Sequence, residues 1–340
     1  MATYKGIQGY SVQSLASDPT ASESVGQLWY NSTTGKFKIG VQSPGAWSAG
    51  ATINQDKEFG ASSQNGTQTA ALMIGGRTPP NTVIAPGAGQ AESYNGTAWS
   101  NVPGSLNNAR KQINSTGTQT VMWAAGGVDP GVNVKYMEIF DGTSWSEANN
   151  LNGAHSDNAA AGNGSTNGVV ASGTSSEEWD GTCWSYGNSM VDVRGAFGGN
   201  GVMTDAIAAG GQQPGTPNAS AHAELWDGTC WSSAPADLNT ARQGTGGMDP
   251  NVPTFMCVGG QTEPGYNYLP NCEQWNGSSW TEVGDFATPK DNVRISGTAT
   301  AGVVAGGGYR SPHPYPGDSM TNETSEWDSP YSASETVTTS

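Results

Sequence analysis

The stretch ELWDGTCWS at residues 224–232 decides the fold, because the chain has almost the same nine letters at 177–185, where it reads EEWDGTCWS. Three further copies follow the same pattern: ESYNGTAWS (92–100), EIFDGTSWS (138–146) and EQWNGSSWT (273–281). The last Trp of each copy follows that of the copy before by 39 to 49 residues. A period of this length, with one small antiparallel sheet in each repeat, predicts a β-propeller.

Composition favours the same class of fold. The 340 residues include 49 Gly and 19 Pro but only six Phe. No apolar pattern with the period of a helix is sustained over three turns. Instead, short apolar runs such as VMWAAG (121–126) and FMCVGG (255–260) are bounded by Gly, Asn or Pro. We therefore predict an all-β chain with many turns.

Two other segments repeat around each copy. An apolar run that ends in small residues comes before it: LMIGG (72–76), WAAGG (123–127), VVASG (169–173), IAAGG (207–211) and CVGGQ (257–261). A segment that resembles LNNAR (106–110) comes after it: LNGAH (151–155), MVDVR (190–194), LNTAR (238–242) and FATPK (286–290). A sixth apolar run, VVAGGG (303–308), leads to SEWDSPYS. We therefore predict six blades.

Each copy has the composition of a β-hairpin. The Asp-Gly pair suits a two-residue type I′ turn, which would place Trp226 opposite Thr229 and Glu224 opposite Trp231. Each buried Trp removes roughly 150–250 Å² from water, which is about 4–6 kcal/mol as an upper bound. A blade needs a neighbour to bury such residues. The repeated indoles that we expect to pack between blades are Trp47, Trp99, Trp145, Trp184, Trp231 and Trp280.

The sixth blade lacks the usual outer hairpin. The upstream segment GAWSAGATINQDK (45–57) places Trp47 before Ile53 as Trp145 is placed before Leu151, and Lys57 falls where Arg falls in other repeats. We predict that the strand around Trp47 completes the last blade and removes its open edge. In the alternative, Tyr331 supplies the outer strand and Trp47 packs elsewhere.

A cation and a Glu recur in the repeat. The cations are Lys57, Arg110, His155, Arg194, Arg242 and Lys290, and the acids are Glu92, Glu138, Glu177, Glu224 and Glu273. A catalytic acid-base pair would be needed once, whereas these residues recur in blade after blade. We therefore interpret them as structural ion pairs.

The di-glycine after an apolar strand, followed by an aromatic pair separated by a turn, resembles the kelch family and the propeller of galactose-oxidase-like proteins. The resemblance covers roughly residues 45–330 and implies a β-propeller. Such propellers serve mostly as binding scaffolds, so it says little about function.

The N-terminal segment GQLWYNSTTGKFKIG (26–40) predicts a strand, a polar turn and a second strand. With the following GAWS it resembles segments of bacteriophage tail-fibre and other virion proteins, including those of marine phages. We expect residues 1–40 to be an anchoring arm that contacts other virion proteins, residues 41–334 to be the propeller, and residues 335–340 to be a tail. The start MATYKGIQGYSVQ lacks the apolar core of a signal peptide, so we expect a virion protein that becomes extracellular when the host lyses.

Charge limits the classes of binding partner, and the cysteines limit the possible disulfides. With 29 acidic and 13 basic residues the net charge is −16, which disfavours nucleic acid and anionic membranes as partners. No apolar run is long enough for membrane insertion. Cys183, Cys230, Cys257 and Cys272 show no CxxC spacing. Cys257 and Cys272 either form a disulfide or are two buried thiols. The chain shows no heptad, and the sequence leaves open whether it is a homo-oligomer.

An enzyme is not expected. His155, His222 and His313 have no partners at metal-ligand spacing, and the chain shows no nucleophile elbow or phosphate loop. We predict no catalytic residue, no metal and no cofactor.

The segments between the di-glycine run and the next repeat differ widely in length, and they should emerge on one face of a propeller. Pro residues stiffen them. On this face we expect a ligand site that includes Tyr266, Tyr268, Tyr309, Arg310, His313, Tyr315 and Arg77. We predict a structural or adhesion protein that binds a host-surface glycan or protein. The alternatives are a decoration protein that contacts only viral neighbours and, less favoured, an oxidase or glycosidase.

Overall fold

The computed structural model describes residues 12–19, 27–42, 45–78, 89–171, 175–215, 218–265, 267–309, 319–329 and 332–337. These residues are all-β: they contain no α-helix, and η1 (Val252–Thr254) is a single 3-10 turn. The chain divides into a larger compact unit, residues 47–328, and a smaller one from residues 1–46 and 329–340, which we describe separately.

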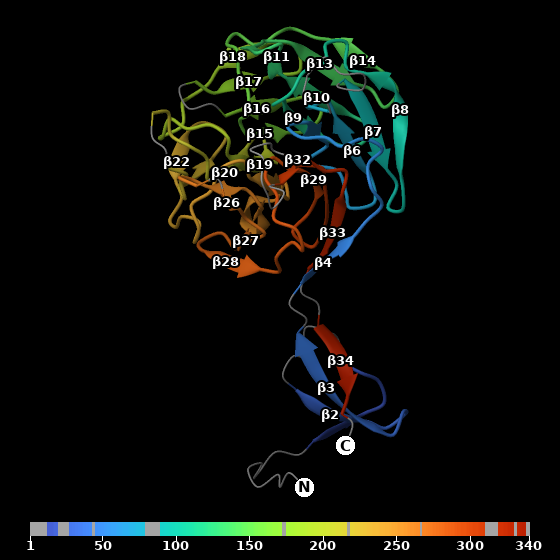
Figure 1. The fold of residues 1–340 in the computed structure, drawn as a ribbon. Helices are drawn as coiled ribbons and strands as arrows, with labels where there is room; N and C mark the ends of the chain where they lie inside the picture. Colours follow the sequence, from blue (N-terminus) through green and yellow to red (C-terminus); the bar gives the residue numbers. More distant parts are fainter. Residues whose placement is uncertain are drawn as a thin grey trace. The chain divides into compact units, whose positions relative to one another are not determined.

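The larger unit is β-propeller-like. Its four-stranded sheets follow one another along the chain and lie around a common centre, with their first strands innermost (Figure 1). We number them by the order of these first strands. Sheet 1 contains β5 (Ala61–Ser62), β6 (Ala71–Ile74), β7 (Gln90–Tyr94) and β8 (Trp99–Ser105). Sheet 2 contains β9 (Asn114–Gly117), β10 (Met122–Ala125), β13 (Met137–Phe140) and β14 (Trp145–Glu147). Sheet 3 contains β15 (Ala160–Gly162), β16 (Gly168–Val170), β17 (Glu177–Trp179) and β18 (Trp184–Tyr186).

The remaining sheets follow the same antiparallel order. Sheet 4 contains β19 (Gly198–Val202), β20 (Asp205–Ala209), β21 (Ala223–Trp226) and β22 (Trp231–Ser233). Sheet 5 contains β23 (Gly246–Met248), β24 (Met256–Val258), β27 (Cys272–Trp275) and β28 (Trp280–Val283). Sheet 6 contains β29 (Arg294–Gly297), β30 (Ala301–Ala305), β33 (Thr324–Asp328) and β4 (Ala46–Ala49). Two-stranded hairpins are formed by β11 (Val128–Asp129) with β12 (Val132–Asn133), β25 (Gln261–Thr262) with β26 (Asn267–Tyr268), and β31 (Gly308–Tyr309) with β32 (Ser319–Met320).

The strand around Trp47 is the fourth strand of sheet 6, as predicted. Its indole lies 5.3 Å from that of Trp327 on β33 and 4.3 Å from the ring of Phe286, measured between ring centroids. The indole Nε1 donates to the carbonyl oxygen of Gly284, at the end of sheet 5, over 2.9 Å. Trp47 therefore contacts residues of sheets 5 and 6 that lie more than 200 positions later in the chain.

Each outer hairpin pairs two aromatic rings. The pairs are Tyr94–Trp99, Phe140–Trp145, Trp179–Trp184, Trp226–Trp231 and Trp275–Trp280, with centroids 4.9 to 5.5 Å apart. Trp47 and Trp327 form the equivalent pair of sheet 6. The later Trp of each of the five pairs is at most 8% exposed, so the predicted burial of these indoles is confirmed. Buried hydrophobic clusters fill the space between consecutive sheets.

The predicted two-residue turn in these hairpins is wrong. Trp226 pairs with Trp231 and Glu224 with Ser233, so four residues, Asp227–Cys230, form the connection. The Asp227 carboxylate accepts the backbone N–H groups of Thr229 and Cys230, both over 2.8 Å. These hydrogen bonds, first from Cys230 and then from Thr229, hold the pKa of Asp227 below its usual value. The side chain thus stabilises a wider turn that brings both indoles to one face.

Sheets 1 and 6, which come from opposite ends of the larger unit's sequence, contact one another. Ser62 Oγ donates to the Ile295 carbonyl over 2.7 Å, and Ser63 Oγ lies 3.0 Å from Ser296 Oγ. A hydrophobic cluster that includes Tyr94 and Val303 lies between the two sheets. The Tyr94 hydroxyl donates to Glu326 on β33, and burial together with this carboxylate raises the pKa of Tyr94 to about 12.

The di-glycines have a specific role at the end of the second strand in five of the six sheets. Gly306 and Gly307 have φ of 66° and 107°, and Gly307 N donates to the Lys57 carbonyl over 2.9 Å. A Cβ on Gly306 would lie 2.5 Å from that same oxygen. The equivalent bonds elsewhere run from Gly76 to Arg110, from Gly127 to His155, from Gly211 to Arg242 and from Gly260 to Lys290. Glycine is therefore required because one sheet approaches the segment that leads into the next.

The smaller unit contains β1 (Gln13–Leu15), β2 (Leu28–Asn31), β3 (Lys36–Gln42) and β34 (Ser332–Thr336). The predicted hairpin at 26–40 is confirmed, since β2 pairs antiparallel with β3. The predicted boundaries at 40/41 and 334/335 differ from the division that the structure shows. The difference arises because β34 pairs with β3 and so belongs to the smaller sheet.

Candidate functional site

One end of the sheets carries the connections between second and third strands. We call it the loop end. The described parts of these connections fall within residues 75–89, 126–136, 171–176, 210–222, 259–271 and 306–323. Their lengths differ between sheets, whereas the residues beneath them repeat. The loop end is therefore the part of the larger unit that varies most from sheet to sheet.

Buried ion pairs lie beneath the loops, and the prediction that the recurrent cations and acids pair is confirmed for all five acids. The nitrogen–oxygen distances are 2.8 Å for Lys57–Glu92, 2.9 Å for His155–Glu177 and 2.7 Å for Arg194–Glu224. Arg110–Glu138 and Arg242–Glu273 form the same pair. The five carboxylates are at most 1% exposed. Each cation precedes the first strand of a sheet, and its acid lies on the third strand of that sheet.

Each carboxylate also accepts backbone N–H groups from the segment that leads into its sheet. Glu177 accepts from Asn152 over 2.7 Å and from Gly153 over 2.6 Å. Burial acts to raise the pKa of Glu177, but the hydrogen bonds from His155, Asn152 and Gly153 together outweigh burial and lower it. The repeated Glu thus fastens the leading segment to the third strand, which is a structural role.

Sheet 6 departs from this pattern. Ser325 stands where the other sheets have the acid, and Lys290 instead pairs with Glu323 over 2.8 Å. The side chain of Glu323 is 51% exposed whereas that of Lys290 is 2% exposed, so in sheet 6 a buried cation pairs with an acid that reaches solvent.

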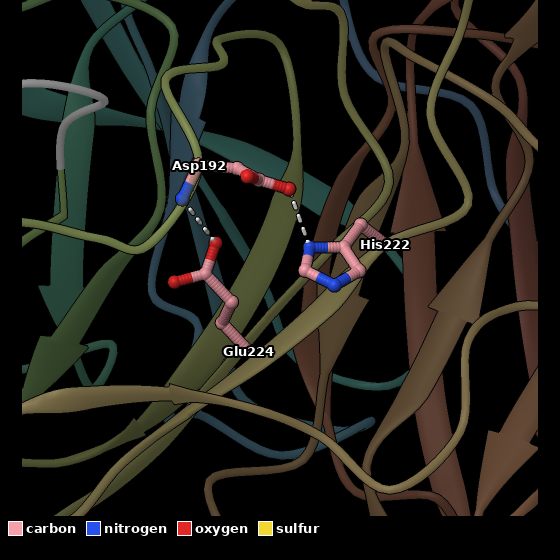
Figure 2. Close-up of side chains that lie close together, drawn as sticks. All are labelled: Asp192, His222 and Glu224. Carbon is pink, nitrogen blue, oxygen red and sulfur yellow. Dashed lines mark hydrogen bonds and ion pairs between the residues drawn. The ribbon is translucent and has the colours of Figure 1, made fainter.

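Sheet 4 extends its ion pair into a cluster of Asp192, His222 and Glu224 (Figure 2). His222 Nδ1 lies 2.7 Å from Asp192 Oδ2, and the Asp192 N–H donates to Glu224 over 3.2 Å. Three such groups within reach of one another have the donor chemistry of a metal site. However, Arg194 Nη1 lies 2.7 Å from Glu224 Oε1, 3.2 Å from His222 Nδ1 and 3.8 Å from Asp192 Oδ2. The Arg194 guanidinium therefore supplies, next to these three candidate ligands, the positive charge that a metal ion would otherwise supply.

The predicted ligand residues are only partly described. Tyr266, Arg310, His313 and Tyr315 lie outside the described residues. Tyr268 and Tyr309 are half-buried on the loop-end hairpins β25–β26 and β31–β32. Arg77 forms an ion pair with Glu58 and lies 5.4 Å from the centre of the Phe59 ring. The guanidinium of Arg77 is thus held in place by the segment that leads into sheet 1.

A polar cavity of about 40 Å³ lies among the first strands, at their loop end. Small residues line much of it, including Ala61, Ala159 and Gly198, and the charged lining groups are Asp157 and Arg294. We call it the axial cavity. Sequence reasoning missed both charged residues, because each occurs once and in no repeated pattern.

A chain of backbone hydrogen bonds fixes the rim of this cavity. Its members stand two residues after each repeated cation: Phe59, Gln112, Asp157, Ala196, Gly244 and Asn292. All six have φ between 49° and 63°, the left-handed region. From Gln112 onward each N–H donates to the carbonyl of the member before it, over 2.7 to 2.9 Å. Five of the six are not glycine, so backbone strain is built into the rim.

The sequence matches no family model and no curated protein. Among the described segments, none is a helix with the length and apolarity needed to cross a membrane.

Proposed function

We propose that the chain is a non-enzymatic, six-bladed, kelch-like β-propeller of a bacteriophage particle, and that its loop end binds a glycan on the host surface. The observation that carries this proposal is the contrast between the repeated frame of buried ion pairs and the loops of unequal length above it. A frame repeated for stability with variable loops on one end is the usual organisation of a binding scaffold.

Six blades in a closed ring are supported by the contacts between sheets 6 and 1. Hydrophobic clusters lie between every pair of consecutive sheets, and the cluster between sheets 6 and 1 makes the order cyclic. The bond from Gly307 to Lys57 repeats, between the last sheet and the first, the bond from Gly76 to Arg110 between the first two. Strand β4 then provides the N-terminal clasp of the ring, because it comes from the start of the larger unit and supplies the fourth strand of its last sheet.

A neutral glycan fits the described loop end better than other partners do. Tyr268 and Tyr309 supply aromatic faces, on which the C–H faces of sugar rings stack. The net charge of −16 disfavours polyanionic partners. Attachment to a particle rests on the sequence of the hairpin at 26–40, and the arm of residues 1–40 is the proposed contact with other virion proteins.

A glycan array probed with the full chain tests the binding function. We expect the wild type to bind neutral glycans, and we expect Tyr268→Ala and Tyr309→Ala to bind them at least about fivefold more weakly because a stacking face is lost. Val121→Ala is the control. Val121 is 38% exposed, in the turn before β10 at the other end of sheet 2, and its truncation should leave binding unchanged.

Array binding that is equal for the wild type and both tyrosine variants would contradict the role of these tyrosines. No binding to any glycan would favour the competing class, a purely structural decoration protein that contacts only viral neighbours. Particles that incorporate the protein normally after residues 1–40 are deleted would overturn the anchoring role of the arm.

A further inference from the structure

We propose that the axial cavity is the sugar subsite of this propeller, and that it takes a pair of neighbouring hydroxyl groups of a neutral sugar between Asp157 and Arg294. This inference rests on the proposed function and names the site and chemistry through which it acts. Two charged residues, Asp157 and Arg294, line this cavity.

Asp157 is held rigidly. Its N–H donates to the Gln112 carbonyl over 2.9 Å, and its own carbonyl accepts the Ala196 N–H over 2.8 Å. Gln112 Nε2 donates to Asp157 Oδ2 over 3.1 Å. Among the described residues, no group is hydrogen-bonded to the other carboxylate oxygen, Oδ1. That oxygen can accept a hydrogen bond from a ligand without losing one from the protein.

Arg294 is held in a similar way. Its Nε donates to the Gly60 carbonyl, and its Nη1 donates to the Val293 carbonyl over 3.1 Å. Within the described part of the chain, Nη2 makes no hydrogen bond to protein. The fixed guanidinium therefore keeps donors for a ligand while two of its nitrogens are anchored.

Charge and size select the class of ligand. The carboxylates of Asp157, Glu58 and Asp291 all act on Arg294, so the cavity has no excess positive charge to attract an acidic sugar. A hydroxyl group both donates and accepts, so adjacent hydroxyls can donate to Asp157 and accept from Arg294 at once. A cavity of about 40 Å³ holds roughly three water molecules. It has room for hydroxyl groups at the edge of a sugar, while the ring itself stays above the rim.

The backbone conformation of Asp157 allows a substitution that tests the role of its carboxylate. Asp157 has φ of 56°, a conformation that Asn adopts at least as readily as Asp, so Asp157→Asn removes the carboxylate without adding backbone strain. Asp205→Asn is the matched control. Asp205 is exposed at the start of β20, at the end of sheet 4 opposite the loops. Arg294→Lys is a second test, since it keeps the charge but loses the planar fork.

The experiment compares these full-length proteins on an array of neutral and acidic glycans, with free galactose, glucose and mannose as competitors. We expect wild type and Asp205→Asn to bind neutral glycans equally, and Asp157→Asn to bind them about tenfold more weakly or not at all. Arg294→Lys should show the same loss. Thermal melting confirms that each variant is folded, and if Arg294→Lys does not fold, the result for Asp157→Asn decides.

Three outcomes would overturn the inference. Neutral-glycan binding by the wild type with equal binding by folded Asp157→Asn would leave the proposed function standing and refute the subsite. Tighter binding of acidic than of neutral glycans would refute the assigned sugar chemistry. Absence of glycan binding by the wild type would refute the proposed function and the subsite together.

Discussion

Glu273→Ala should destabilise the protein by about 3–5 kcal/mol, because the substitution leaves Arg242 charged and buried without its acid. Glu273 is 1% exposed and pairs with Arg242, which is 0% exposed. Its carboxylate also accepts the N–H groups of Asn239 over 2.7 Å and of Thr240 over 3.2 Å. One truncation therefore leaves several buried donors without their acceptor.

The measurement is urea unfolding followed by Trp fluorescence, and the chain offers a matched control. Glu282 stands directly opposite Glu273 in the strand pairing but is exposed, so Glu282→Ala should change stability by no more than about 0.5 kcal/mol. The double variant Arg242→Met, Glu273→Leu should recover much of the loss, because it removes both buried charges. A loss below about 1 kcal/mol for Glu273→Ala would contradict the structural role of the ion pairs.

Trp327→Ala should destabilise the larger unit by a similar amount, about 3–5 kcal/mol. Trp327 is 0% exposed, its Nε1 donates to the Ala299 carbonyl over 2.9 Å, and it packs on Trp47. Trp47 comes from the far N-terminal side of the unit. The loss in Trp327→Ala should therefore depend on whether Trp47 is present.

A double-mutant cycle isolates that dependence. Trp47→Ala and Trp327→Ala should couple by about 0.5–1.5 kcal/mol, the range for an aromatic pair in contact. Trp145→Ala serves as the control, since Trp145 pairs with Phe140 in sheet 2 and should be additive with Trp327→Ala within about 0.5 kcal/mol. Additive effects of Trp47→Ala and Trp327→Ala would contradict the placement of β4 beside β33.

The repeats made the ion pairs and the strand around Trp47 predictable from the sequence. The recurrence of Arg194 and Glu224 at matching places in other copies of the repeat predicted structural ion pairs, because a feature repeated from sheet to sheet serves the sheet. Trp47 and Trp145 stand at matching places in the repeat. That match predicted that the strand around Trp47 belongs to sheet 6, although the residues of the strand do not themselves indicate it.

The turn and the axial cavity were not predictable in the same way. The Asp-Gly dipeptide is typical of a two-residue turn, but the Asp227 side chain binds two backbone N–H groups and stabilises a longer one. Asp157 and Arg294 line one cavity because the starts of the first strands of different sheets converge there. The sequence does not predict the left-handed backbone of the rim, because Phe59, Gln112 and Ala196 are residue types that rarely adopt it.

A closed ring requires contact between sheets 6 and 1, and a cysteine pair across that contact tests it most directly. Ser63 and Ser296 are buried, and their hydroxyl oxygens lie 3.0 Å apart. In the double variant Ser63→Cys, Ser296→Cys, oxidative refolding followed by peptide mass spectrometry should yield a linked peptide that contains both positions. A folded, monomeric double variant in which these two thiols stay free would contradict the closed ring.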